Sequence, residues 1–207
     1  MTACRACPRL VVWRETVAVE KRAAFRTETY WGKPVPGFGP MDASLLIVGL
    51  APAAHGANRT GRMFTGDPSG DFLYRALYEV GMASQPTSVS RDDGMELYGV
   101  RMASPVRCAP PENKPTPLER DTCSSFLREE ISLMPRLRSV MVLGAFGWKA
   151  VLPLLGPERP KFGHGVEAVV GGLRVFGCYH VSPHNTYTGR LTQEMLQNVL
   201  KRAAGSA

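Results

Sequence analysis

Two polar, glycine-rich segments each follow a short apolar run that is typical of a buried β-strand. The first segment, GLAPAAHGANRTGRMFTGD, covers residues 49–67 and follows the apolar run 45–48. The second, HVSPHNTYTGRLT, covers residues 180–192 and follows the run 175–179. In open α/β sheets, ligands bind in the crevice beyond the carboxyl ends of the strands, where such loops begin. We therefore expect these segments, here called the first loop and the second loop, to form the two walls of one site.

The rest of the chain alternates between strand and helix patterns. Strands are expected at 45–48, 98–103 and 139–143, and a β-hairpin is expected at 167–179, interrupted at two glycines. Helices are expected at 70–81, 118–133, 146–155 and from 191 to about 203, with Ser69 and Thr116 as caps of the first two and Pro117 at the first position of the second. This alternation predicts an α/β fold with three α/β/α layers around a mostly parallel sheet.

Length and composition are those of one globular domain. The 207 residues are 44% hydrophobic and 21% charged, which suffices for an ordinary core without disulfides. Residues 1–43 are expected to form an N-terminal extension, helical at first and then rich in turns. If the predicted strands are parallel, both loops share a cleft with the proline-rich stretch 105–117. We find no internal repeat and no low-complexity linker.

The net charge favours a polyanionic partner. Lysine and arginine number 25 against 18 acidic residues, which gives a formal charge of +7. No stretch approaches the roughly 18 consecutive apolar residues of a membrane span, and the N-terminus lacks the apolar core of a signal peptide. We expect a cytoplasmic monomer that makes no membrane contact.

Four of the five cysteines fall into two pairs. Cys4 and Cys7 have the spacing C-x2-C, and Cys108 and Cys123 have the spacing C-x14-C. Because disulfides are rare in a reducing cytosol, such pairs indicate metal or redox chemistry. Four thiolates can bind zinc or an iron-sulfur cluster, and spacing does not separate the two. Ordinary buried thiols are the alternative, and Cys178, which lies in an apolar run, is expected to be one.

The two loops resemble the two motifs of family 5 uracil-DNA glycosylases, the b type of bacteria and archaea. The four paired cysteines also match that family and its family 4 relative, in which the equivalent residues hold a 4Fe-4S cluster. The resemblance runs from Cys4 to the last predicted helix. It implies a 4Fe-4S cluster on Cys4, Cys7, Cys108 and Cys123, with zinc as the less favoured occupant.

The implied activity is that of a monofunctional DNA glycosylase, which hydrolyses the N-glycosidic bond of uracil and starts base excision repair. Hypoxanthine, xanthine and etheno-cytosine are implied as further substrates, in double-stranded or single-stranded DNA. The base must leave the stack to be reached, so the enzyme needs a pocket with a stacking face. We expect Phe64 to stack on the base, with Gly49, Leu50, Ala51 and Ala53 completing the pocket. Alternatively, Phe64 only anchors the first loop to the core.

His180, Asp67 and Asn113 are the expected catalytic residues. The resemblance assigns His180 to donate a hydrogen bond to a base oxygen, on which negative charge develops as the base departs. The first loop is apolar where most of the wider superfamily carries an acidic or amide group that orients water, so Asp67 and Asn113 are the candidates for that role. Asp67 is equally suited to cap a helix at Pro68, and Asn113 to form a turn.

DNA contacts are expected from polar side chains around the cleft. These are Arg59, Arg62, His184, Asn185, Tyr187 and Arg190. Arginines and loop amides bind phosphates without reading sequence, and the second loop would enter a groove as a wedge, with Tyr187 as its bulk. Alternatively, each of these side chains is a solvated surface group that makes no DNA contact.

Three other functions remain alternatives. An iron-sulfur nuclease would use the E-x-K match of Glu112 and Lys114, but that motif must lie on a strand, and the surrounding prolines oppose one. An electron carrier or a zinc-bound DNA-binding module would require neither loop. The cluster itself is expected to be structural, because it would tie the N-terminal extension to the segment that presents Asn113. A redox-sensing role stays open.

Overall fold

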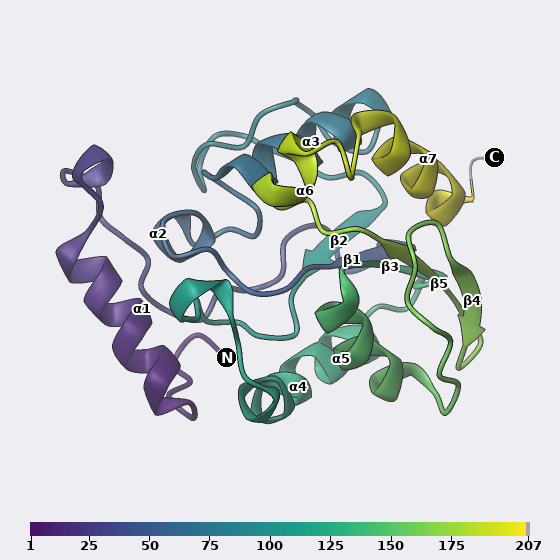
Figure 1. The fold of residues 1–207 in the computed structure, drawn as a ribbon, viewed down its shortest axis with the longest axis horizontal. Helices are drawn as coiled ribbons and strands as arrows, with labels where there is room; N and C mark the ends of the chain where they lie inside the picture. The colour runs from purple at the N-terminus through teal and green to yellow at the C-terminus, as the bar shows by residue number, and fades with distance from the viewer. Residues whose placement is uncertain (206–207) are drawn as a thin grey trace.

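The computed structural model describes residues 1–205. Its centre is a five-stranded sheet in the order β2-β1-β3-β5-β4 (Figure 1). The strands are β1 (Leu45–Val48), β2 (Val100–Ala103), β3 (Ser139–Leu143), β4 (Glu167–Val170) and β5 (Leu173–Cys178). Strands β2, β1, β3 and β5 are parallel, and β4 pairs antiparallel with β5 as the expected hairpin. The predicted mostly parallel sheet is confirmed.

Helices cover both faces of the sheet. They are α1 (Pro8–Glu20), α2 (Ala57–Thr60), α3 (Pro68–Glu79), α4 (Pro117–Ser132), α5 (Ala145–Leu155), α6 (Pro183–Tyr187) and α7 (Gln193–Ala204), with short 3-10 turns at Ala23–Phe25 and Pro111–Asn113. Figure 1 shows α3, α6 and α7 on one side of the sheet and α4 and α5 on the other, with α1 at the margin. The three-layer α/β/α prediction is therefore confirmed.

Alternation along β1 explains why the sheet has two apolar faces. Leu45 and Ile47 join the core on the α3 and α7 side, whereas Leu46 and Val48 join the core on the α4 and α5 side. All four side chains are buried, as expected for a central parallel strand that is covered on both faces. This burial fixes the register, because a slip of one residue would exchange the two faces.

The boundaries of three elements correct the sequence prediction. Helix α3 begins at Pro68, because Asp67 and not Ser69 is its cap: the Asp67 carboxylate accepts hydrogen bonds from the backbone of Ser69 and Gly70. Strand β2 begins at Val100, after the half-exposed Tyr98 and the turn at Gly99. Helix α7 begins at Gln193, because Thr192 caps it. The predicted cap of α4 is confirmed, since Thr116 and Glu119 form a reciprocal capping box.

Parallel pairing brings the loops together. The segments that follow β1, β2, β3 and β5 all leave the same edge of the sheet, which places the first loop, the proline-rich stretch and the second loop around one crevice. Within residues 1–205, no helix combines the length and the apolar character that spanning a membrane requires.

Candidate active site

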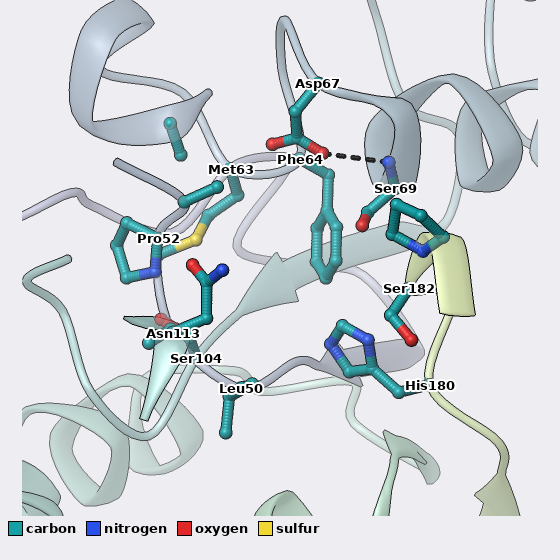
Figure 2. A pocket seen from close by; sticks show the side chains of 14 residues that line it. Leu50, Pro52, Met63, Phe64, Asp67, Ser69, Ser104, Asn113, His180 and Ser182 are labelled. Carbon is teal, nitrogen blue, oxygen red and sulfur yellow. Dashed lines mark hydrogen bonds between the residues drawn. The ribbon is translucent and has the colours of Figure 1, made fainter. Parts of the chain in front are cut away.

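A cavity of about 340 Å³ lies at this edge of the sheet. It is lined by Leu50, Ala51, Pro52, Ala53, Ala57, Met63, Phe64, Asp67 and Ser69 from the first loop and the start of α3, by Ser104 and Asn113 from the stretch after β2, and by His180, Ser182 and Pro183 from the second loop. Figure 2 shows these side chains converging from the three segments. The expected juxtaposition of Phe64 and His180 around one hollow is thus present, and the volume lies in the range of small-molecule sites.

Two glycines place the Phe64 ring in the cavity. Phe64 has a left-handed backbone (φ 53°), an uncommon conformation for a bulky residue. A Cβ at Gly49 would lie 2.6 Å from the Phe64 Cζ, and a Cβ at Gly70 would lie 1.7 Å from the Phe64 carbonyl oxygen. Both positions therefore require glycine. Gly49 supports the ring from beneath and does not itself line the cavity, whereas Leu50, Ala51 and Ala53 do.

His180 lies two residues beyond the end of β5, with its ring in the cavity (Figure 2). Burial lowers the pKa of His180 to about 4, because desolvation disfavours the imidazolium form. The ring is therefore neutral at physiological pH and retains one N–H donor. Its backbone carbonyl accepts a hydrogen bond from Asn185 Nδ2 at 2.8 Å, which links the start of the second loop to α6.

Asp67 both caps α3 and lines the cavity. Its Oδ1 accepts hydrogen bonds from Ser69 N at 2.9 Å and from Gly70 N at 3.1 Å. No hydrogen bond reaches its Oδ2 from the described part of the chain, and Figure 2 shows this carboxylate at the rim of the cavity. Burial raises the pKa of Asp67, although the two backbone donors act in the opposite direction. The geometry therefore allows Asp67 to cap α3 through Oδ1 and also to present Oδ2 to a water molecule.

Asn113 reaches the cavity from the proline-rich stretch. It ends the 3-10 turn Pro111–Asn113 and has a left-handed backbone (φ 55°). Figure 2 shows its amide group pointing into the hollow opposite Phe64. The neighbouring Glu112 and Lys114 are exposed and pair with each other on this turn. Because E-x-K nucleases need the motif on a strand, this arrangement argues against the nuclease alternative.

Seven cavity residues were missed by sequence reasoning. They are Pro52, Ala57, Met63, Ser69, Ser104, Ser182 and Pro183. Ser104 could have been predicted, because it directly follows β2 at the edge of the sheet where the loops after the other parallel strands begin. Met63 and Ala57 had none, since apolar residues in a loop are indistinguishable from core residues until the loop is folded.

The expected phosphate contacts of Arg59 and Arg62 need correction. Arg59 is 8% exposed and bonds to Glu28, to the carbonyls of His55 and Gly66, and stacks on the Phe25 ring. Arg62 is 4% exposed and bonds to Asp93, Ser88 and Thr65. Both guanidinium groups are buried and bonded inside the protein, where they hold the first loop in shape instead of lying at the surface as phosphate contacts require.

The other expected DNA contacts lie on the second loop. His184, Tyr187 and Arg190 are exposed, and Tyr187 is 79% exposed. The Arg190 guanidinium lies 4.6 Å from the centre of the Tyr179 ring, beside His180. Asn185 is partly buried, and its side chain is engaged by the His180 carbonyl. Three of the four residues thus remain available to a ligand outside the cavity.

The four paired cysteines line one small cavity between α1, α4 and the stretch after β2. Arg14 Nη1 donates to Cys108 Sγ at 2.8 Å, and the backbone N–H of Arg107 donates to Cys123 Sγ at 3.4 Å. Burial raises the pKa of Cys108, and it raises that of Cys123 to about 11. Across residues 1–205, no three histidine, cysteine or acidic side chains are grouped closely enough to hold a metal ion. Cys178 is fully buried in β5, as expected of a core residue.

Comparison with known proteins identifies the family. Residues 36–204 match the model of the uracil DNA glycosylase superfamily. The chain is 54% identical to the type-5 uracil-DNA glycosylase of Mycobacterium tuberculosis over 98% of its own length and 78% of that protein. It is 51% identical to those of Pyrobaculum aerophilum and Thermus thermophilus, over 99% of its length and 89% and 95% of theirs. The chain therefore belongs to the type-5 uracil-DNA glycosylase family.

Proposed function

We propose that this protein excises uracil from DNA by hydrolysing its N-glycosidic bond inside the cavity at the sheet edge. One observation carries this proposal: Phe64 and His180, from loops more than a hundred residues apart, face the same hollow of about 340 Å³. A small hollow with one aromatic wall and one partly buried polar donor fits a flipped base.

Phe64 and His180 have complementary roles in this proposal. Phe64 stacks on the extruded base, and the rigid support from Gly49 keeps its ring in place at little entropic cost. His180 donates an N–H to a base oxygen, on which negative charge accumulates as the glycosidic bond breaks. A buried donor aimed at developing charge is worth about a hundredfold to a thousandfold in rate. Because the ring is neutral, it stabilises the anion by hydrogen bonding and not as a cation.

Asp67 and Asn113 hold the attacking water in this proposal. The free Oδ2 of Asp67 accepts a proton or a hydrogen bond from that water, while Oδ1 keeps the helix cap. The amide of Asn113 orients the water from the opposite wall. The carbohydrate left behind develops positive charge, and the Asp67 carboxylate and the DNA phosphates stabilise it.

The second loop binds the DNA around the flipped nucleotide. His184 and Arg190 contact phosphates, and the exposed Tyr187 enters the gap in the stack. We propose that both double-stranded and single-stranded DNA are bound, because the flipped base supplies the recognition in both. With Arg59 and Arg62 buried, fewer phosphates are neutralised than the sequence implied, so the dependence of binding on salt is shallower.

Hypoxanthine, xanthine and etheno-cytosine are proposed as further substrates. The wall formed by Leu50, Ala51, Pro52 and Ala53 is apolar and offers few groups that would reject a purine. An apolar wall discriminates weakly between rings that differ in exocyclic groups.

The cysteine site fits a 4Fe-4S cluster on Cys4, Cys7, Cys108 and Cys123. Four thiols with two N–H···S hydrogen bonds line one cavity. Thiolates are the ligands of both zinc and iron-sulfur clusters, and zinc is the less favoured occupant in this proposal. When bound, the cluster supplies a cross-link between the N-terminal segment, α4 and the loop that carries Asn113.

The test is excision from a panel of duplexes, each with one uracil, hypoxanthine, xanthine or etheno-cytosine. Alkali-labile breaks in the uracil duplex, absent from the undamaged duplex, are expected with the parent protein. Binding without breaks would leave a DNA-binding module, and metal-dependent breaks in undamaged DNA would indicate a nuclease. Either result would overturn the proposal.

A further inference from the structure

Two arginines beside the four paired cysteines are almost completely buried. Arg14 is 2% exposed and Arg107 is 1% exposed, and both line the cysteine cavity. Arginine is seldom buried without full pairing. Nevertheless, Nε of Arg14 and both Nε and Nη1 of Arg107 have no hydrogen-bond partner within residues 1–205. A buried donor without a partner is destabilising, because the hydrogen bond it made to water in the unfolded chain is not replaced. These donors therefore call for an anionic or electron-rich group in the cavity.

The acidic partners of these arginines are shared with other arginines. Glu15 lies 3.6 Å from Arg14 but forms its short bonds to Arg5, at 2.5 and 3.0 Å. Glu130 bonds to both Arg101 and Arg107. Four guanidinium groups therefore share two carboxylates, which leaves two positive charges in excess. The nearby Arg9 pairs with Glu119 alone and contributes no excess.

This excess matches the charge of the proposed occupant. A 4Fe-4S core with two positive charges and four thiolate ligands carries two negative charges overall. Burying such a centre without compensation is strongly unfavourable, because charged groups in a low-dielectric interior need partners. Hydrogen bonds to cluster sulfurs and the local net charge are also what set a cluster's reduction potential. The contact from Arg14 Nη1 to Cys108 Sγ at 2.8 Å is already one such bond.

We propose that Arg14 and Arg107 are positioning residues of the cysteine site: they compensate the charge of the bound cluster and raise its reduction potential. The inference rests on the proposed 4Fe-4S occupant but not on the proposed catalytic residues. Removing either cation disfavours the state with one more electron. The potential therefore shifts in the negative direction.

The experiment compares Arg14→Met, Arg107→Met and Arg14→Lys with Arg128→Met as the matched control. Arg128 lies on α4, the helix that carries Cys123, but it is exposed and does not line the cysteine cavity. Each protein is purified anaerobically, and its iron and sulfide are measured. Its one-electron couple is then titrated on an electrode, with absorbance near 400 nm as the readout.

Each methionine variant is expected to shift the equilibrium by about tenfold towards the oxidised form, which is about 59 mV for one electron. Arg14→Lys, which keeps the charge, is expected to shift less, and Arg128→Met not at all. If Arg14→Met or Arg107→Met loses its iron while Arg14→Lys and Arg128→Met retain it, that loss supports the same charge argument. Unchanged potentials in fully loaded methionine variants would overturn the inference, and so would equal iron loss in the lysine and methionine variants.

Two measurements on the parent protein, its iron content and its excision activity, distinguish a failure of this inference from a failure of the proposed function. A parent without iron overturns the cluster and this inference together, whatever its excision activity. A parent with iron that leaves uracil in DNA refutes the proposed function and leaves the charge argument to be decided by the potentials.

Discussion

The two loops that enclose the cavity are built in opposite ways. The first loop is tied to the protein interior: Arg59, Arg62 and Asn58 are buried, and each bonds to a different neighbouring segment. The second loop is buried in the core through Val181 and Leu191 near its two ends, but between them it exposes His184, Tyr187 and Arg190. Under the proposed function, this difference assigns base binding to the loop that is tied down and DNA contact to the loop that is exposed.

The largest effect is expected from removing a buried contact that ties the first loop to the protein interior. Arg62→Met removes one partner of a buried ion pair with Asp93, whose distance is 2.7 Å. Leaving a buried charge unpaired costs about 3–5 kcal/mol, so the free energy of unfolding measured with urea should fall by that order. Arg190→Met on the second loop should leave it unchanged. Parent-like stability of Arg62→Met with a reduced salt dependence of DNA binding would instead place Arg62 on the DNA.

The same ion pair predicts a loss of stability in acid. Burial alone would raise the pKa of Asp93, but hydrogen bonds from Arg62 and from three backbone N–H groups hold it below its ordinary value. The stabilisation is therefore present above the unfolded pKa of about 3.9 and is lost as the pH falls through the lower folded value. In Arg62→Met, this part of the pH dependence should be smaller than in the parent.

His180→Ala tests the end of the second loop that faces the base. Excision of uracil under single-turnover conditions should slow by about a hundredfold to a thousandfold, because the buried N–H donor is lost. Since burial lowers the pKa of His180 to about 4, the parent rate should show no titration of this ring between pH 5 and pH 8. A rate that rises with a pKa near the ordinary histidine value would contradict a neutral donor.

Asp67→Asn separates chemistry from helix capping. Asparagine caps a helix as well as aspartate does, so α3 should keep its stability. If the carboxylate acts on water, excision should slow by about tenfold or more. Asp67→Ala is the reference, because it should also lose about 1 kcal/mol of stability. A parent-like rate for Asp67→Asn would leave Asp67 with the cap alone.

Asn113→Ala tests the third segment around the cavity. We expect excision to slow by about tenfold without loss of folding, because the exposed side chain contributes little to packing. Glu112→Ala, on the same turn but outside the cavity lining, is the control. Near-normal single-turnover rates for Asn113→Ala would remove this residue from the mechanism.

The smallest effect is expected on the exposed side of the second loop. Tyr187→Ala should weaken binding to uracil-containing duplex by about 1 kcal/mol, since stacking of an aromatic ring on a base is worth at least that much. Stability should not change, because Tyr187 is 79% exposed. An unchanged affinity would mean that the second loop does not enter the stack through this residue.

The sheet and most helices could be predicted because their signals are local. Apolar runs such as 45–48 and 139–143 became β1 and β3 with the expected bounds, and Thr116 capped α4 as expected. The errors at α3 and β2 are also local in origin. Asp67 and Ser69 are both good caps, and only the folded backbone shows which one accepts the hydrogen bonds.

The amino-acid sequence by itself determined the layered α/β fold with a mostly parallel sheet and therefore the meeting of the two loops, because strand-helix alternation is a local pattern and helical crossovers make the strands parallel. It did not determine that Arg59 and Arg62 face inwards, that Gly49 supports Phe64, or that Arg14 and Arg107 enclose the cysteines. Those facts depend on partners such as Glu28, Asp93 and Glu130, which are remote in the chain. The sequence shows that a residue is an arginine and therefore charged. Whether that charge contacts solvent, DNA or a buried carboxylate depends on how distant segments pack together.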